Sequence, residues 1–99
     1  MKPSILIELD HPRNIRLNTN ALVKVEEVLG KPLSEFGSAF GLKEIRAMLW
    51  AGLLHEDRKL SLEDVGDLID EAGFEYVSTK VGEAITIAMG LKAEESDPN

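Results

Sequence analysis

The chain has 99 residues, of which 43% are hydrophobic, and this predicts one domain whose core needs neither metal nor disulfides. There are 11 Lys and Arg residues and 18 Asp and Glu residues, so the net charge is −7. This charge argues against nucleic acid and anionic membranes as main partners, because both are bound by clusters of Lys and Arg. Cysteine is absent, which excludes disulfides, thiolate zinc sites and cysteine nucleophiles.

The first expected element is a β-hairpin over residues 4–18. Apolar residues occupy every second position in both halves, at Ile5, Ile7 and Leu9 and again at Ile15 and Leu17. This spacing is typical of half-buried strands, and residues 11–14 are expected to form the turn around Pro12. A lone hairpin is marginal in water, so this one must lie on helices or pair with another chain.

Helices are expected over most of the remaining chain. Apolar spacing and capping residues predict a helix over 21–29, a short one after Pro32, a third over about 43–55, a fourth from a Ser61–Asp64 capping box to Gly73, and a last one over 74–89. The expected fold class is α+β, mainly helical: an N-terminal β-hairpin followed by a small bundle of about five helices. Residues 1–91 would form a single domain, and the polar segment 92–99 a disordered acidic tail.

The third expected helix is unusual because it is apolar on two faces. One stripe comprises Ile45, Met48, Leu49, Gly52 and Leu53, and the other comprises Ala47, Trp50, Ala51 and Leu54. A helix of this kind is buried on more than one side. The first stripe suffices for a core and Trp is favoured at interfaces, so the second stripe is a candidate protein-binding surface. Burial of Trp50 in the core is an equally weighted alternative.

The fourth expected helix carries five carboxylates on its outer face, namely Glu63, Asp64, Asp67, Asp70 and Glu71. The more common interpretation of such a face is a solvated surface that keeps the protein in solution. The functional interpretation is a surface complementary to a basic partner. On that interpretation Asp67, Asp70 and Glu71 join the second stripe as candidate protein-binding residues.

The sequence supports no catalytic, cofactor-binding or metal-binding residues. His55, Glu56 and Asp57 are consecutive at a helix end, so their side chains point in different directions, and His11 lies in the expected turn. The helix–loop–helix around them fails the calcium-loop test, because the first ligand position falls on a residue without a side-chain oxygen. No phosphate-binding glycine loop or GxSxG motif is present. A small metal-binding or enzymatic domain that uses His55 remains the least favoured alternative.

Four short motifs follow one another within residues 20–66, inside a match that covers about residues 4–90. They are Asn-Ala-Leu with Glu-Glu-Val-Leu-Gly in residues 20–30, Leu-Trp-Ala-Gly-Leu at 49–53, His-Glu-Asp at 55–57 and Leu-Ser-Leu-Glu-Asp-Val-Gly at 60–66. In order and spacing they resemble the tail assembly chaperone family of long-tailed phages, in the branch shared with prophages and gene transfer agents. Each motif is short and weak alone, so the resemblance depends on all four motifs occurring together in this order and spacing.

The resemblance implies a non-enzymatic protein that binds the aggregation-prone tape measure protein and helps to recruit tail tube subunits. Some members of the family also exist in a longer, frameshifted form. We expect a soluble protein of the bacterial host cytoplasm, since no apolar run has the length of a signal peptide or a membrane span. No cofactor, nucleic acid or membrane is expected as a partner, and a homo-oligomer stays open. The alternative is a structural tail component, a tube or minor tail protein, that is retained in the particle.

Overall fold

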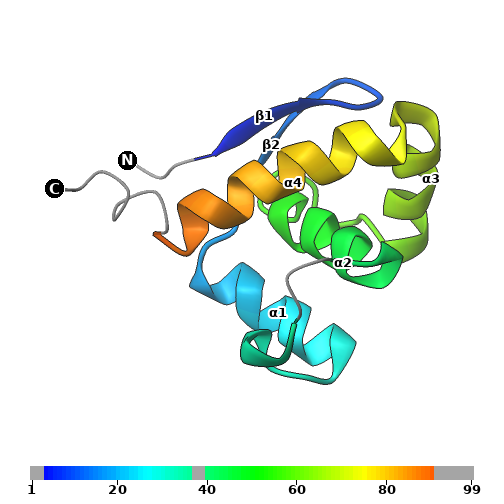
Figure 1. The fold of residues 1–99 in the computed structure, drawn as a ribbon. Coiled ribbons are helices and arrows are strands. Elements are labelled where there is room, and N and C mark those ends of the chain that lie inside the picture. Colours follow the sequence, from blue (N-terminus) through cyan, green and yellow to red (C-terminus); the bar gives the residue numbers. More distant parts are fainter. Residues whose placement is uncertain (1–3, 37–39, 91–99) are drawn as a thin grey trace, which may run out of the picture.

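The computed structural model describes residues 4–36 and 40–90. Strands β1 (Ile5–Glu8) and β2 (Pro12–Ile15) precede the helices α1 (Thr19–Leu29), α2 (Leu42–Leu53), α3 (Leu62–Ala72) and α4 (Phe74–Ala88). The hairpin lies along α4, and β1 begins on the side of the molecule where α4 ends (Figure 1). The prediction of an α+β, mainly helical fold with an N-terminal hairpin is confirmed. The expected tail at 92–99 lies outside the described residues.

The described residues form four α-helices, where the sequence predicted about five. After Pro32 the chain makes only a 3₁₀ turn, Leu33–Glu35, and Phe36 is already extended with ψ 139°. A helix this short cannot recover the cost of its first turn from its own hydrogen bonds. The Glu26 carboxylate instead accepts the Leu33 N–H at 2.7 Å and ties the turn to α1. Residues 37–39 of the expected short helix lie outside the described part of the chain.

The hairpin is present, but its turn is displaced from the predicted position. Pro12 lies in β2, opposite Glu8, and the connection is formed by the residues between these two. Proline is tolerated at the first residue of a strand, where its missing N–H leaves no gap in the ladder. Asp10 organises the connection, because its carboxylate accepts the His11 N–H at 2.9 Å and pairs with Arg13. The prediction of a turn at 11–14 is therefore wrong by about two residues.

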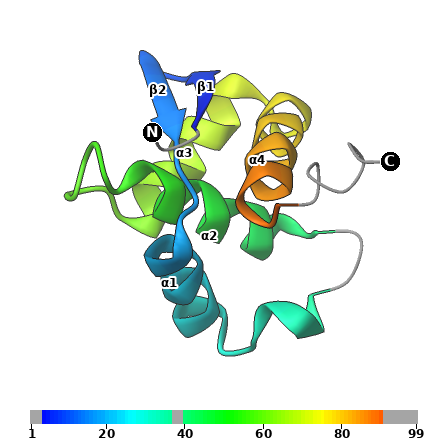
Figure 2. The ribbon, with the colours of Figure 1, turned by 90° about the vertical axis from the view of Figure 1, so that its left-hand side faces the viewer.

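Helix α2 lies at the centre of the molecule, with α1 on one side and the hairpin on the other (Figure 2). It also contacts α3 and α4. Seven of its twelve residues are buried: Ile45, Ala47, Met48, Leu49, Ala51, Gly52 and Leu53. The prediction that this helix is buried on more than one side is confirmed. The core around it is completed from the other elements by Ile7, Ile15, Leu17, Ala21, Val25, Val65, Ile69, Val77, Val81 and Ala84.

Helix α2 packs tightly against the end of the hairpin at Gly52. A Cβ atom at this position would lie 2.6 Å from Cγ2 of Ile15, whose side chain is fully buried. The Gly52 carbonyl also accepts the Arg16 N–H at 2.9 Å. Gly52 is not among the glycines with positive φ, so glycine is required here for space and not for its backbone conformation.

Local signals set the ends of the remaining helices. The Asn18 side chain accepts the Ala21 N–H and begins α1, and Gly30 ends this helix with a φ of 72°. Ser61 and Asp64 exchange side-chain and backbone hydrogen bonds at 3.0 Å each, which confirms the predicted capping box of α3.

Candidate protein-binding surfaces

The apolar stripe that was predicted to bind a partner is largely covered by the protein's own fold. Ala47 and Ala51 are 1% and 4% exposed, since α1 packs on α2. Trp50 is half-buried, and its indole N–H donates to the Leu60 carbonyl at 2.9 Å. The prediction of a free surface at Ala47 and Ala51 is therefore wrong. Leu54 is half-buried and lines an open cleft.

The carboxylates of α3 are largely free of intramolecular partners. Glu63, Asp67, Asp70 and Glu71 are exposed, and in the described residues none of them forms an ion pair. Asp64 differs from the other four because it is held in the capping box. Acidic residues near a helix N-terminus also favour the helix dipole, so Glu63 has a local role as well. Both interpretations of this face, a solvated surface and a surface for a basic partner, remain compatible with the geometry.

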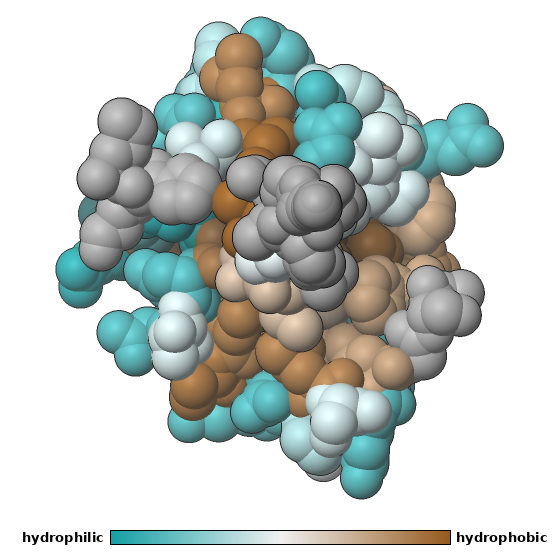
Figure 3. Space-filling model, turned by 60° about the vertical axis from the view of Figure 1, so that its left-hand side comes forward, coloured by the Kyte–Doolittle hydropathy of each residue, from teal (hydrophilic) through white to brown (hydrophobic). Residues whose placement is uncertain are grey.

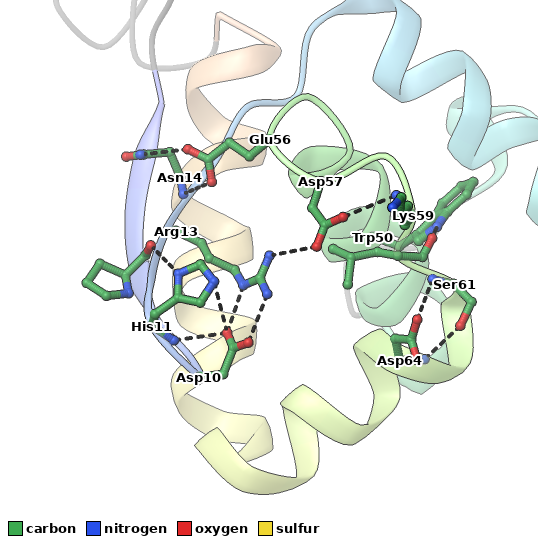
Figure 4. Close-up of polar contacts among 12 residues, drawn as sticks. Asp10, His11, Arg13, Asn14, Trp50, Glu56, Asp57, Lys59, Ser61 and Asp64 are labelled. Carbon is green, nitrogen blue, oxygen red and sulfur yellow. Dashed lines mark hydrogen bonds and ion pairs between the residues drawn. The ribbon is translucent and has the colours of Figure 1, made fainter.

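The His55–Asp57 segment holds the loop after α2 against the hairpin. His55 Nε2 lies 2.8 Å from the Asn14 carbonyl oxygen. The Glu56 carboxylate accepts the backbone N–H of Asn14 at 3.2 Å and its side-chain amide at 2.9 Å. The Asp57 carboxylate turns instead toward Arg13, at 3.8 Å (Figure 4). These contacts close the outer edge of β2, and strand edges left open invite pairing with other chains.

The electrostatics of this segment agree with a structural role. Burial raises the pKa of Glu56, but the hydrogen bonds from Asn14 outweigh it and hold the pKa below its ordinary value. Across residues 4–36 and 40–90, no group of three or more His, Asp or Glu side chains is placed to hold a metal ion. Sequence reasoning missed the contacts to Asn14, because no local pattern links residues that are 41 and 42 positions apart.

The Asp10–Arg13 pair closes the other end of the hairpin. Arg13 is only 5% exposed, and its Nε and Nη2 donate to the two Asp10 carboxylate oxygens at 2.8 and 2.9 Å. The hydrogen bonds from Arg13 lower the pKa of Asp10 from 3.8 to about 2. A fork-to-fork pair of this kind fixes orientation as well as charge. The pair therefore gives the nearly buried Arg13 guanidinium hydrogen-bond acceptors beside the core.

Apolar side chains remain accessible elsewhere on the surface. Figure 3 shows one face on which hydrophobic residues gather along the middle and hydrophilic residues lie around them. A narrow groove of about 50 Å³ between the hairpin and α4 has walls that include Ile5, Leu17, Ala84 and Ile87. The large hydrophobic residues with the most exposed surface are Leu42 at 71%, Leu6 at 53% and Met89 at 48%. A contiguous apolar patch marks a surface for a protein partner, whereas exposed apolar residues that lie singly are normal on any protein surface.

Comparisons of this chain with protein-family models, curated proteins and solved structures found no match. The resemblance to tail assembly chaperones therefore rests on the sequence motifs and their order. Among the described residues, no helix combines the length and hydrophobicity that crossing a membrane requires.

Proposed function

We propose that this chain is a non-enzymatic tail assembly chaperone of a phage or prophage. In this role it binds the tape measure protein and helps to recruit tail tube subunits in the bacterial cytoplasm. The observation that carries the proposal is the order and spacing of the four motifs within residues 20–66, which are similar to those of that family.

The composition of the surface supports the proposal. A chaperone for an aggregation-prone helical protein needs exposed apolar side chains to bind its client and surplus charge to keep the complex dispersed. Leu42 and Leu6 are 71% and 53% exposed, and the chain carries a net charge of −7. The folded chain therefore offers both exposed apolar side chains and surplus charge without having to expose its core.

The proposed client surface is the outer side of α3 together with the neighbouring groove. This groove lies between α2 and α3 and has a volume of about 200 Å³, and it is lined by Leu42, Lys43 and Arg46 of α2 and by Gly66, Ile69 and Asp70 of α3. Asp67 and Glu71 are exposed on the same helix as Asp70. A client segment laid here would cover Leu42, which is worth about 1–2 kcal/mol for a leucine that is mostly exposed. Its basic residues would lie on the α3 side, beside the three carboxylates, because Lys43 and Arg46 make the α2 side of the groove positive.

The proposal is tested by co-expression pull-down with the product of the long, helix-rich reading frame expected next to this gene. The wild-type chain should retain that long protein on the resin. The variants Leu42→Asp and Asp70→Lys should each retain several-fold less of it. Aspartate at the first position of α2 suits the helix N-terminus, so Leu42→Asp should fold. Val23→Asp is the matched control, because Val23 is 43% exposed on α1 and lies outside the proposed surface. No retention by wild type would overturn the proposal.

Mass spectrometry of purified particles distinguishes the chaperone from the structural alternative. A chaperone should be absent from the finished particle or present only in traces. Retention at the copy number of a tube or minor tail protein would assign the chain to the structural class.

A further inference from the structure

A cleft of about 370 Å³ lies between the start of α1 and the loop that follows α2. The cations that line it are Arg16, Lys24 and Arg58, with His55 beside them. No Asp or Glu of the described residues lines this cleft. The cleft is therefore positively charged although the chain as a whole has a net charge of −7. A concave site lined by charges of one sign concentrates ions of the opposite sign.

The cations of the cleft are not neutralised by carboxylates in the described part of the chain. Lys24 and Arg58 are exposed, and within residues 4–36 and 40–90 neither they nor Arg16 form an ion pair. The Nε atom of Arg16 is buried and has no hydrogen-bond partner within the described residues, so this guanidinium is not neutralised by an internal acceptor at that atom.

The rest of the cleft is lined by apolar side chains and by the side-chain amides of two asparagines. Leu54 is half-buried and provides the apolar surface, since Ala21 and Ala51 are only 6% and 4% exposed, and Asn18 and Asn20 provide side-chain amides at the start of α1. The first turn of α1 contains no acidic residue, so the positive end of its dipole is not neutralised there. The cleft therefore combines cations with an apolar wall whose accessible surface comes mainly from Leu54.

We infer that this cleft binds an acidic segment of a partner protein. Its carboxylates pair with Arg16, Lys24 and Arg58, and an apolar side chain of the same segment packs on Leu54. Arginine receives carboxylates in a forked geometry that suits this pairing. A free phosphate would leave the apolar wall unused, and nucleic acid requires a longer track of cations than three residues provide. The inference does not depend on a role in phage tails.

The test uses an acetylated, fluorescein-labelled peptide of alternating Glu and Leu, with the corresponding Gln and Leu peptide as its uncharged counterpart. Fluorescence anisotropy should show saturable binding of the Glu peptide to the full chain, at least ten-fold tighter than the Gln peptide. Binding should weaken markedly between 50 and 300 mM salt, about the range over which exposed charges become screened. In ¹H–¹⁵N spectra the shifted amides should include residues 18–24 and 51–58.

The decisive variant is the double substitution Lys24→Glu with Arg58→Glu, which should weaken the Glu peptide at least ten-fold. The matched control is Lys43→Glu with Lys59→Glu. It changes the net charge equally at two exposed positions that do not line the cleft, and it should bind the peptide nearly as well as wild type. Native spectra of both double variants establish that the fold is retained.

Three results would overturn the inference. The first is no binding of the Glu peptide to the wild type, and the second is equal weakening by the two double variants. The third is displacement of the peptide by inorganic phosphate at matched ionic strength, which would make the cleft a simple oxyanion site.

Discussion

Replacing Gly52 with alanine sets two effects of opposite sign against each other. Alanine is favoured over glycine within a helix by about 1 kcal/mol, although Gly52 is only one residue from the end of α2, which reduces that gain. Against it stands the new Cβ atom, which would lie 2.6 Å from Cγ2 of Ile15. That methyl group is attached directly to the Cβ of a fully buried β-branched residue, so it cannot rotate away at low cost.

The steric effect should prevail. Overpacking a tight core costs about 1–3 kcal/mol, and here the adjustment would also strain the hydrogen bond from the Arg16 N–H to the Gly52 carbonyl, now 2.9 Å. We expect Gly52→Ala to lower the free energy of unfolding by about 1–2 kcal/mol. For a domain of this size that corresponds to a fall in Tm of roughly 5–10 °C.

Urea unfolding, followed by circular dichroism, measures this change, and Gly82→Ala is the matched control. Gly82 lies within α4, and a Cβ atom there would meet nothing within 4 Å, so the same substitution should stabilise the protein by about 0.5–1 kcal/mol. In the double variant with Ile15→Leu, which removes the clashing methyl, part of the loss should be recovered. A Gly52→Ala protein as stable as wild type would refute the close approach between α2 and the hairpin.

Three other contacts make separate predictions for the same urea assay. The pKa of Asp10 is lowered from 3.8 to about 2, so its stabilisation is complete above about pH 4 and is lost as the pH falls through about 2. Its side chain is 41% exposed, and after allowance for solvent screening Asp10→Asn should cost about 1 kcal/mol at pH 7. This variant should also lose less stability than wild type between pH 5 and pH 2. Asp70→Asn should follow the wild-type pH profile, and a profile of Asp10→Asn that matches wild type would contradict the pairing. Ser61→Ala removes the cap of α3 and should lower the free energy of unfolding by about 1 kcal/mol. Its control is Ser34→Ala, at an exposed position in the 3₁₀ turn, which should leave the stability nearly unchanged. Equal effects of the two substitutions would count against the cap. Trp50→Phe keeps most of the ring packing but removes the indole hydrogen bond, so a loss of about 1 kcal/mol is expected, and unchanged stability would show that the bond contributes nothing.

Most of the local elements could be predicted from the sequence alone. The helix ends at Gly30 and Gly73 and the Ser61–Asp64 box were predictable, because capping depends on residues three or four positions apart. The nearly all-round hydrophobicity of residues 43–55 also predicted a central helix, since such a helix must be covered on more than one side. The hairpin was predictable from its alternation, but its turn was displaced because Asp10 holds the connection about two residues earlier.

Which of these surfaces remain accessible depends on how the elements pack together. Ala47 and Ala51 are 1% and 4% exposed, and nothing in the periodicity of α2 indicates which neighbour will cover which stripe. The basic cleft likewise assembles Arg16, Lys24 and Arg58 from three separate segments. Periodicity and capping act within one or two helical turns, whereas surfaces and clefts are created when distant segments dock. The sequence therefore specified the elements, and their docking specified the sites.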